Sequence, residues 1–398
     1  MQNPPPIFDA LEQLDFLSKP NCLKEIKDFS FALDFLKAYR GSQGTFNSYR
    51  REIERLLLWS SLIAKKPLKE LNRQDIEAFL EFCQNPPKEW VGIKKAPHFI
   101  NKEGLRIANP EWRPFVVTVA KSAFRKGKKP EIKNFARSQG AVKETFAILS
   151  SFYNYLLQEE YVFANPVALI RQKSQFIRRQ QSMPKVRRLS EMQWHYVIEN
   201  TKKMAEENPI MQERTLFIIT ALYAMYLRIS ELTASARWLP KMSDFNRDSE
   251  GSWWFNTVGK GNKQRQIAVS DAMLEALKRY RKFLGLSQLP SPADNSPLLP
   301  KEKGKGAISS TTYVREIVQS CFDSAIEKLK KDGQEEEAET LNEATVHWLR
   351  HTGISDDVKH RPREHVRDDA GHSSSATTDR YIDIELRARH ASAKKKSL

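Results

Sequence analysis

The residue types that could do chemistry together lie near the C-terminal end of the sequence. His347 and Arg350 stand three residues apart in the run T-V-H-W-L-R-H-T-G, so on a helix they would share one face. His372 follows a glycine at the start of a Ser/Thr-rich segment, whose serines are N-cap candidates for a second helix. Tyr381 comes nine residues after His372, about two and a half turns along such a helix. Together they would place a hydroxyl that could act as a nucleophile near basic side chains that could bind a phosphate.

Cutting a phosphodiester without water requires a nucleophile, charge stabilisation around phosphorus and a proton donor for the departing oxygen. Guanidinium groups suit the second task because their fixed fork of N–H donors matches phosphate geometry. A tyrosine hydroxyl has an ordinary pKa of about 10, so it needs help to attack at neutral pH. Two further basic residues extend the set upstream: Arg228 in L-R-I-S-E-L and Lys260 in G-K-G-N-K-Q-R.

Taken in order, these positions resemble the tyrosine recombinases, also called the phage-integrase family. In that family an Arg begins a helix, a Lys sits on a β-hairpin, and an H-x-x-R box, a G-H pair and a nucleophilic Tyr follow. Each short motif is weak alone, whereas six matching positions in the right order are a strong signal. The candidate catalytic residues are Arg228, Lys260, His347, Arg350, His372 and Tyr381.

The resemblance implies a role for each of these side chains. Tyr381 would form a 3′-phosphotyrosyl link and release a 5′-hydroxyl, so no nucleotide cofactor is expected. Arg228 and Arg350 would grip the non-bridging oxygens, and His372 would donate to a phosphate oxygen. His347 would be the general base towards the tyrosine, or a hydrogen-bond partner that orients it. Lys260, on a mobile hairpin, would protonate the 5′-oxygen.

Neighbouring residues offer competing interpretations. Lys263 lies in the same turn as Lys260, and the family pattern favours Lys260. His351 is interpreted as a buried or helix-packing residue. His347 and His351 are four apart, which is zinc-ligand spacing, but a metalloprotease would need Glu where Trp348 stands. No third ligand is evident, so no metal is expected.

Composition indicates a nucleic-acid partner. The chain has 398 residues and a formal net charge of +16, which favours a polyanion: nucleic acid first, an anionic membrane second. The longest apolar run, 215–227, is too short to span a bilayer, and the sequence opens without a signal-peptide pattern. The three cysteines have no metal-like or disulfide-like spacing. We therefore expect a cytoplasmic, nucleoid-associated protein that does not engage a membrane.

Hydrophobic periodicity predicts a first, helical domain over residues 1–170, resembling the core-binding (SAM-like) domain of integrases. Residues 1 to about 40 read as helical, and a later amphipathic helix covers Val142 to Leu157. Residues 84–140 interrupt the pattern with many prolines and with 13 bases against 4 acids. This insertion is either a solvated segment or an arm that tracks DNA phosphates. Residues 171–188 carry seven bases and no acid, and are expected to be a linker that contacts DNA.

The second domain, 189–398, would be the catalytic domain with a C-terminal tail. Ser190 and Gln193 fit a capping box at its first helix. Two strands, 253–258 and 265–269, are expected to form a hairpin around a Gly-rich turn. The predicted fold is therefore mainly α with a small antiparallel β-sheet. One stretch departs from the family: residues 355–370 are mostly polar where an apolar helix is usual.

The function that these residues favour is site-specific DNA recombination. The protein would act as a homotetramer on two double-stranded DNA sites, exchanging strands through a Holliday junction, with a possible accessory directionality factor. A type IB topoisomerase shares the chemistry but relaxes supercoils as a monomer. A DNA-binding protein that has lost catalysis is a third alternative, although all six catalytic residue types are present.

Overall fold

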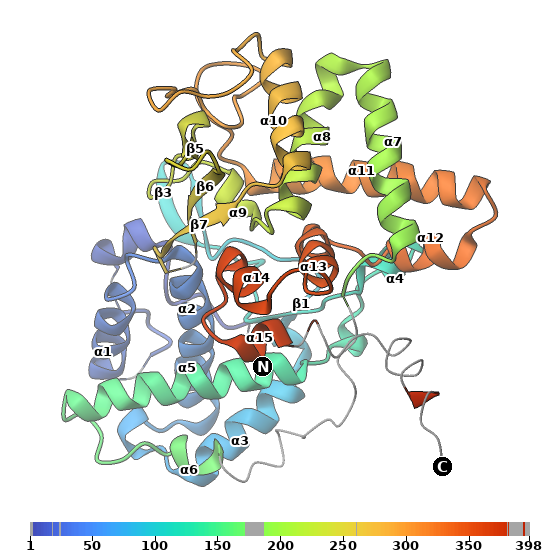
Figure 1. Cartoon of the computed structure of the whole chain (residues 1–398). Helices are drawn as coiled ribbons and strands as arrows, with labels where there is room; N and C mark the ends of the chain where they lie inside the picture. Colours follow the sequence, from blue (N-terminus) through green and yellow to red (C-terminus); the bar gives the residue numbers. More distant parts are fainter. Residues whose placement is uncertain are drawn as a thin grey trace. The chain divides into compact units, whose positions relative to one another are not determined.

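The computed structural model describes residues 3–17, 19–23, 25–171, 187–259, 261–379, 381, 393 and 394. The chain divides into two compact units, Met1–Ser182 and Met183–Leu398, which are drawn in Figure 1 and described here one at a time. Most of the predicted linker, residues 172–186, lies outside the described part of the chain. The prediction of a mainly α fold is confirmed, with short strands in both units.

Four longer helices form the frame of the first unit. They bury Phe35, Leu56, Phe79 and Phe152 in one core. A capping box begins α3 (Arg73–Gln84), because the side chains of Asn72 and Asp75 each accept the other's backbone N–H. The helical elements are α1 (Ile26–Lys37), α2 (Gln43–Trp59), η2 (Ser60–Ala64), η3 (Leu68–Glu70), α3 (Arg73–Gln84), α5 (Gln139–Gln158) and α6 (Ala168–Arg171).

The prediction of a helix from the first residue is wrong. Residues 3–10 form neither helix nor strand, and in the described part of the chain before α1 the helical structure is one 3₁₀ turn, η1 (Leu11–Phe16). The three prolines at positions 4–6 explain the difference, because proline lacks an N–H and restrains the residue before it to extended backbone. Ile7 and Phe8 are fully buried, and their amides donate to Glu54 Oε1 at 2.6 and 3.1 Å.

The insertion at 84–140 folds onto the core of this unit. Trp90, Trp112 and Phe115 are buried in it, so the interpretation as a solvated segment is wrong for this part. One strand pair is parallel, β1 with β4, and the other, β2 with β3, is an antiparallel hairpin. The elements are η4 (Lys88–Trp90), β1 (Val91–Gly92), β2 (Phe99–Lys102), β3 (Leu105–Ala108), β4 (Phe115–Val116), α4 (Lys121–Arg125) and η5 (Ile132–Asn134). Contact of the insertion with DNA stays a prediction.

A buried carboxylate joins the insertion to α2 and α5. Glu52 accepts from Arg55 at 2.7 Å, from Arg51 at 2.8 Å, from Arg137 at 3.2 Å and from the Thr145 hydroxyl at 2.8 Å. We call these five residues the Glu52 cluster. Burial raises the pKa of the carboxyl, but the three guanidinium charges together outweigh burial and lower it to about 2.

The second unit is a helical domain around a three-stranded antiparallel sheet, and α7 and α8 pack side by side in it (Figure 1). The hairpin and the capping box of Ser190 and Gln193 are as predicted, whereas strand β5 was not anticipated. The elements are α7 (Glu191–Glu207), α8 (Pro209–Ala224), α9 (Ile229–Leu232), η6 (Met242–Asp244), β5 (Phe245–Arg247), β6 (Trp253–Val258), β7 (Gln264–Ala268), α10 (Asp271–Phe283), α11 (Thr311–Lys331), α12 (Glu335–Leu341), α13 (Val346–Asp357), α14 (Arg363–Ala370) and α15 (Ser375–Asp379).

Helix α13 carries three of the chemically interesting residues and packs closely on α8. The contact is made at Gly353, where a Cβ would overlap the carbonyl oxygen of Tyr223. Thr352 on the same turn accepts the amide of Leu189, at 2.9 Å, and so ties α13 to the chain entering α7. These contacts fix the rotation of α13 and thereby the direction of its functional side chains.

Candidate active site

Tyr381 lies just beyond α15 rather than along it, which corrects the prediction of a longer helix. Its amide donates to the carbonyl of Thr378, at 2.9 Å. The hydroxyl is in hydrogen-bond contact with Nδ1 of His351. The ring lies nearly parallel to that of His372, with centroids 5.9 Å apart. The nucleophile candidate is thus placed between two imidazoles.

Arg350 is almost completely buried beneath these rings. Its Nη1 donates to the carbonyl of Tyr226, and its Nη2 donates to the carbonyl of Ala370 at 2.5 Å. Nη2 also lies 3.4 Å from Nε2 of His372. Tyr226 has a φ of +49°, a strained left-handed conformation, at the turn between α8 and α9. The strained turn presents the carbonyl that holds Arg350.

His372 is held in one orientation from both ring nitrogens. Its Nδ1 lies 2.9 Å from the hydroxyl oxygen of Thr378. Because the guanidinium of Arg350 can only donate, Nε2 of His372 accepts, and the ring proton belongs on Nδ1. Burial first, and then the charges of the nearby arginines, lower the pKa of His372 to about 4. The ring is therefore neutral at physiological pH.

Arg228 stands at the N-terminus of α9 and is positioned by a buried glutamate. Glu231 accepts the backbone N–H of Arg228 at 2.7 Å and its Nη1 at 3.1 Å. The same carboxylate receives two parallel bonds from Arg265 of β7, both at 2.9 Å. We call Glu231, Arg228 and Arg265 the Glu231 cluster. The Arg228 side chain keeps 27% of its surface exposed, so it can still reach a ligand.

Positive charge at the site exceeds the negative charge that contacts it. Burial, and then Arg228 and Arg265, lower the pKa of Arg350 to about 9, which leaves it charged at neutral pH. Burial and two of these arginines also lower the pKa of His347. Glu231 is shared by two of the guanidinium groups, whereas Arg350 is bound by carbonyl oxygens. An anion such as a phosphodiester would relieve this imbalance.

The polar stretch before the G-H pair has a structural role. Pro362 lies at the start of α14 rather than inside a helix, which proline tolerates. The buried Asp369 accepts the backbone amide of Ala268 at 3.2 Å and pairs with Arg361 at 2.6 Å. Gly371 then ends α14 with a φ of +63°, and a Cβ there would meet the Arg265 side chain. The ion pair of Asp369 with Arg361 thus adds to the apolar packing of α14, in which Val366 and Ala370 are fully buried.

Lys260 lies outside the described residues. The hairpin around it is formed, since Val258 pairs with Gln264 and the Gly259 amide donates to the carbonyl of Lys263 at 2.8 Å. In the described part of the chain, no group of three or more His, Cys, Asp or Glu side chains could hold a metal ion. Among the same residues, no helix is both long and apolar enough to cross a membrane.

Comparison with known proteins agrees with this geometry. The model of the phage integrase family matches residues 187–387, which is about half of the chain and includes every residue of the site. This chain belongs to the phage integrase family. The integrase is 26% identical, over 258 residues, to the tyrosine recombinase XerC of Thermodesulfovibrio yellowstonii, covering 63% of this chain and 73% of that one. A second XerC, from Anoxybacillus flavithermus, is 27% identical over 203 residues, covering 50% of this chain and 60% of that protein.

Two solved structures share the fold at low sequence identity. The XerH site-specific recombinase bound to palindromic difH substrate has a TM-score of 0.58 and 16% identity, covering 97% of the integrase and 93% of XerH. The Tn1549 transposon integrase in complex with a circular intermediate DNA has a TM-score of 0.51 and 13% identity, covering 92% and 98% of the two chains. The fold class is therefore that of the tyrosine recombinases.

Sequence reasoning missed the roles of three residues of the site. His351 was interpreted as a buried or helix-packing residue, yet its ring contacts the tyrosine hydroxyl. Glu231 suggested only a helix-surface pair with Arg228, the alternative to catalysis, whereas it is buried and positions that arginine. Its place three residues after Arg228, the N3 position of a helix that begins there, was the signal for this role. Arg265 was not singled out, although it also bonds Glu231. Arg265 offers no comparable local signal, because its partner is 34 residues away.

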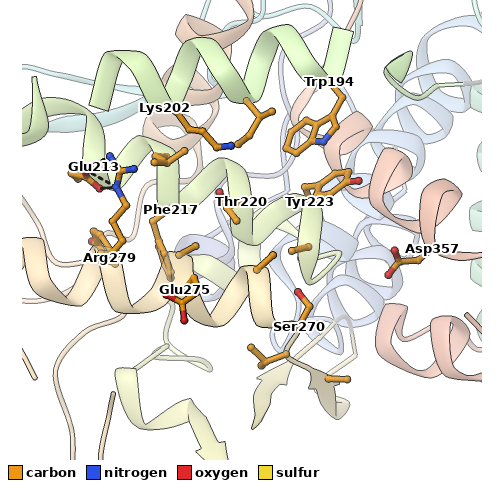
Figure 2. Close-up of a pocket in the computed structure, with 18 of the residues that line it drawn as sticks. Trp194, Lys202, Glu213, Phe217, Thr220, Tyr223, Ser270, Glu275, Arg279 and Asp357 are labelled. Carbon is orange, nitrogen blue, oxygen red and sulfur yellow. Dashed lines mark hydrogen bonds and ion pairs between the residues drawn. The ribbon is translucent and has the colours of Figure 1, made fainter. Parts of the chain in front are cut away.

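A separate pocket of about 840 Å³ lies between α7, α8, α10 and β7 of the same unit (Figure 2). Trp194 and Tyr223 stack in its wall with ring centroids 4.0 Å apart. Arg279 forms a bidentate pair with Glu213 on another side. Asp357, at one end of the pocket, also accepts the hydroxyl of Tyr226. Asp357 thus connects the pocket to Tyr226, whose carbonyl holds Arg350. The pocket is lined by none of the predicted catalytic side chains that the structure describes.

Proposed function

We propose that this integrase is a site-specific DNA recombinase that cleaves and rejoins DNA through a 3′-phosphotyrosyl intermediate. The observation that carries the proposal is the Tyr381 hydroxyl, held against an imidazole beside a buried Arg350 that has no carboxylate partner among the described residues. Family membership and the names of the XerC relatives support the same reaction class. Strand exchange would pass through a Holliday junction.

The chemical step divides the work among the residues of the site. Tyr381 attacks phosphorus, its oxygen forms the new bond, and the 5′-oxygen of the next nucleotide departs. Arg228 and Arg350 bind the non-bridging oxygens, where preorganised donors stabilise the charge that develops in the transition state. His372 has its lone pair on Nε2 and a depressed pKa; a bound phosphate would raise that pKa and let the ring donate a hydrogen bond.

Two further residues act on protons. His347 is the general base towards Tyr381, or a hydrogen-bond partner that orients it; its ring lies 4.7 Å from that of His351. Lys260 protonates the departing 5′-oxygen, a role that rests on the family pattern and on its place in the turn between β6 and β7. Because the energy of the broken bond is kept in the phosphotyrosyl link, the reaction needs neither a nucleotide nor a metal.

The two units take different parts in this proposal. Residues 1–170 would bind the core site as a DNA-binding domain, 171–188 would cross the phosphate backbone as a linker, and 189–398 would perform catalysis. The active form would be a homotetramer on two double-stranded DNA sites, with a possible directionality factor. The XerH structure was obtained with bound substrate DNA, which supports DNA as the partner here. The protein would work in the cytoplasm, at the nucleoid.

Replacing the nucleophile tests the proposal directly. Tyr381→Phe removes one oxygen, so it should abolish the covalent adduct on a nicked suicide DNA while leaving the DNA dissociation constant nearly unchanged. Tyr196→Phe is a matched control in the same unit, because its hydroxyl bonds only the exposed Asp332, at 2.9 Å. The adduct is measured as protein that migrates with labelled DNA after denaturation. An adduct that persists in Tyr381→Phe would place the nucleophile elsewhere, and relaxed circles without recombinant junctions would favour a topoisomerase.

A further inference from the structure

The imidazole that touches the nucleophile is not the one that the family pattern marks. His351 lies one helical turn beyond His347 on α13, and its Nδ1 contacts Oη of Tyr381. The two rings have centroids 5.3 Å apart and planes 34° apart. The ring of His347 instead stands edge-on to that of His351, with centroids 4.7 Å apart and an interplanar angle of 89°. His351 therefore separates His347 from direct contact with the phenol in this arrangement.

The surroundings of His351 keep its ring neutral and able to accept a proton. Burial is the largest cause of its lowered pKa, and the charges of His347, Arg350, His372 and Arg187 add to it, giving a value of about 4. In a neutral ring with the proton on Nε2, the lone pair is on Nδ1, the atom that faces the phenol. The hydrogen bond then runs from the tyrosine hydroxyl to the imidazole, which is the direction required for deprotonation.

The other imidazole beside the tyrosine cannot take this role in the same arrangement. His372 uses Nε2 to accept from Arg350 and Nδ1 to bond Thr378. Its ring is stacked on the tyrosine ring, with an interplanar angle of 8°, so its nitrogens do not point at the hydroxyl along a bonding direction. Of the imidazoles described around Tyr381, His351 alone has a nitrogen in contact with the reacting oxygen.

We propose that His351 is the general base of the cleavage step, which leaves His347 the second of its two proposed roles, that of an orienting partner; the assignment rests on the proposed function. As Oη of Tyr381 bonds to phosphorus, the phenolic proton moves to Nδ1 of His351 and the bond from phosphorus to the 5′-oxygen breaks. The 5′-oxygen takes its proton from the general acid assigned to Lys260. In rejoining, a 5′-hydroxyl attacks phosphorus and gives its proton to that lysine. His351 then returns its proton to the departing phenol, so protons and bonds balance over the cycle.

Binding of DNA would adjust this base to its task. An imidazole with a pKa near 4 is a weak proton acceptor, and general bases work best with a pKa near the operating pH. A phosphodiester bound at Arg228 and Arg350 places negative charge beside the ring, which favours the imidazolium and raises the pKa. The base would thus strengthen only when substrate is present, and the tyrosine would stay protonated in the absence of DNA.

The test compares single-turnover adduct formation by the full chain and its variants on nicked suicide DNA. General base catalysis is typically worth about 10²–10⁴-fold, so His351→Ala should slow adduct formation by about that factor without changing DNA affinity. The unsubstituted enzyme should lose rate on the acid side as His351 becomes protonated. In His351→Ala the plateau above the pKa of this base should vanish, and the rate should rise in proportion to hydroxide concentration over the whole pH range. A rate that stays at, or exceeds, that of the unsubstituted enzyme would overturn the assignment.

A more acidic phenol separates proton removal from a merely structural effect. Placing 3,5-difluorotyrosine at position 381 lowers the phenol pKa, so it should restore much of the rate lost in His351→Ala. It should not restore Arg350→Ala, because that residue binds phosphate oxygens. Equal rescue of both variants, or rescue of His347→Ala in place of His351→Ala, would refute the role of His351. Absence of any adduct with the unsubstituted enzyme would instead overturn the proposed function and this assignment together.

Discussion

Each of the two units of this protein buries a glutamate among arginines. The two clusters differ in how far their guanidinium groups are already bound by other protein atoms. In the Glu52 cluster, Arg55 also donates to the carbonyl of Pro114 at 2.9 and 2.7 Å and lies over the Phe115 ring. The side chains of Arg55 and Arg137 are only 10% and 7% exposed. These two guanidinium groups are committed to protein atoms, so they hold the insertion against α2.

The Glu231 cluster repeats this chemistry with a different outcome. Arg265 gives the carboxylate two bonds and is only 10% exposed, whereas Arg228 gives it one side-chain bond and stays 27% exposed. The charges of Arg228 and Arg265 both lower the pKa of Arg350. Arg350 itself donates to the carbonyl oxygens of Tyr226 and Ala370, and to no carboxylate among the described residues.

A buried carboxylate surrounded by arginines is therefore not evidence of a binding site. Exposure alone does not separate the clusters either, because Arg51 of the Glu52 cluster is 42% exposed. The distinguishing feature is the number of carboxylates that hold the exposed guanidinium: Arg51 pairs with both Glu52 and Glu144, whereas Arg228 pairs with Glu231 alone among the described residues.

The largest effects should come from exchanging one arginine in each cluster for alanine. Arg228→Ala should lower the adduct-formation rate by about 10²–10³-fold, the usual cost of losing one preorganised donor to transition-state charge. Its folding should change little, because Arg265 still pairs with Glu231. Arg55→Ala leaves Glu52 buried with fewer partners, so it should destabilise the first unit by about 3–5 kcal/mol.

Two measurements on each variant decide whether the clusters really differ. Denaturant unfolding followed by tryptophan fluorescence reports stability, and adduct formation per folded molecule reports chemistry. Arg55→Ala should keep the chemistry at temperatures where it is folded. If Arg55→Ala loses the chemistry without losing stability, or Arg228→Ala unfolds the second unit, the contrast between a structural and a functional cluster fails.

A smaller effect concerns acid stability and belongs to the Glu52 cluster. The pKa of Glu52 falls from an ordinary 4.5 to about 2 on folding, so its contribution to stability is complete above pH 4.5 and is lost as the pH falls towards 2. A shift of this size corresponds to roughly 3 kcal/mol, at 1.36 kcal/mol per pKa unit. The stability difference between the unsubstituted protein and Glu52→Gln should therefore shrink between pH 5 and pH 3. A difference that stays constant over this range would mean that Glu52 is not ionised with its arginines.

Features that depend on neighbouring residues could be predicted from the sequence. The order of short motifs pointed to Arg228, His347, Arg350, His372 and Tyr381 because each motif is local. The hairpin was also local, because its two short strands and the Gly-rich turn between them lie in one stretch of the sequence. The capping box at Ser190 was likewise readable from four consecutive residues.

What the sequence could not predict depends on long-range contacts. Glu52 meets Arg137 and Thr145 across 85 and 93 residues, and no spacing rule links such positions. The insertion was read as solvated or arm-like from its prolines and lysines, although Trp90 and Trp112 were a signal that part of it is buried. His351 was interpreted as a buried or helix-packing residue, because its contact with the tyrosine hydroxyl joins positions 30 residues apart.

The smallest expected effect concerns the exposed bases of the insertion. The Glu52 cluster holds the insertion against the core, but these exposed bases are not part of that cluster. Lys128 and Lys129 follow α4 in an exposed basic run that includes the exposed Phe124. If this run contacts phosphates, Lys128→Gln with Lys129→Gln should weaken binding to all DNA sequences alike. Each lost contact should flatten the dependence of log affinity on log salt by about 0.9. Lys133→Gln is the matched control, because Lys133 already pairs with Glu131 at 2.7 Å and should change the slope less. An unchanged slope in the double variant would leave the insertion with a structural role alone, and its positive charge would then serve solubility rather than DNA binding.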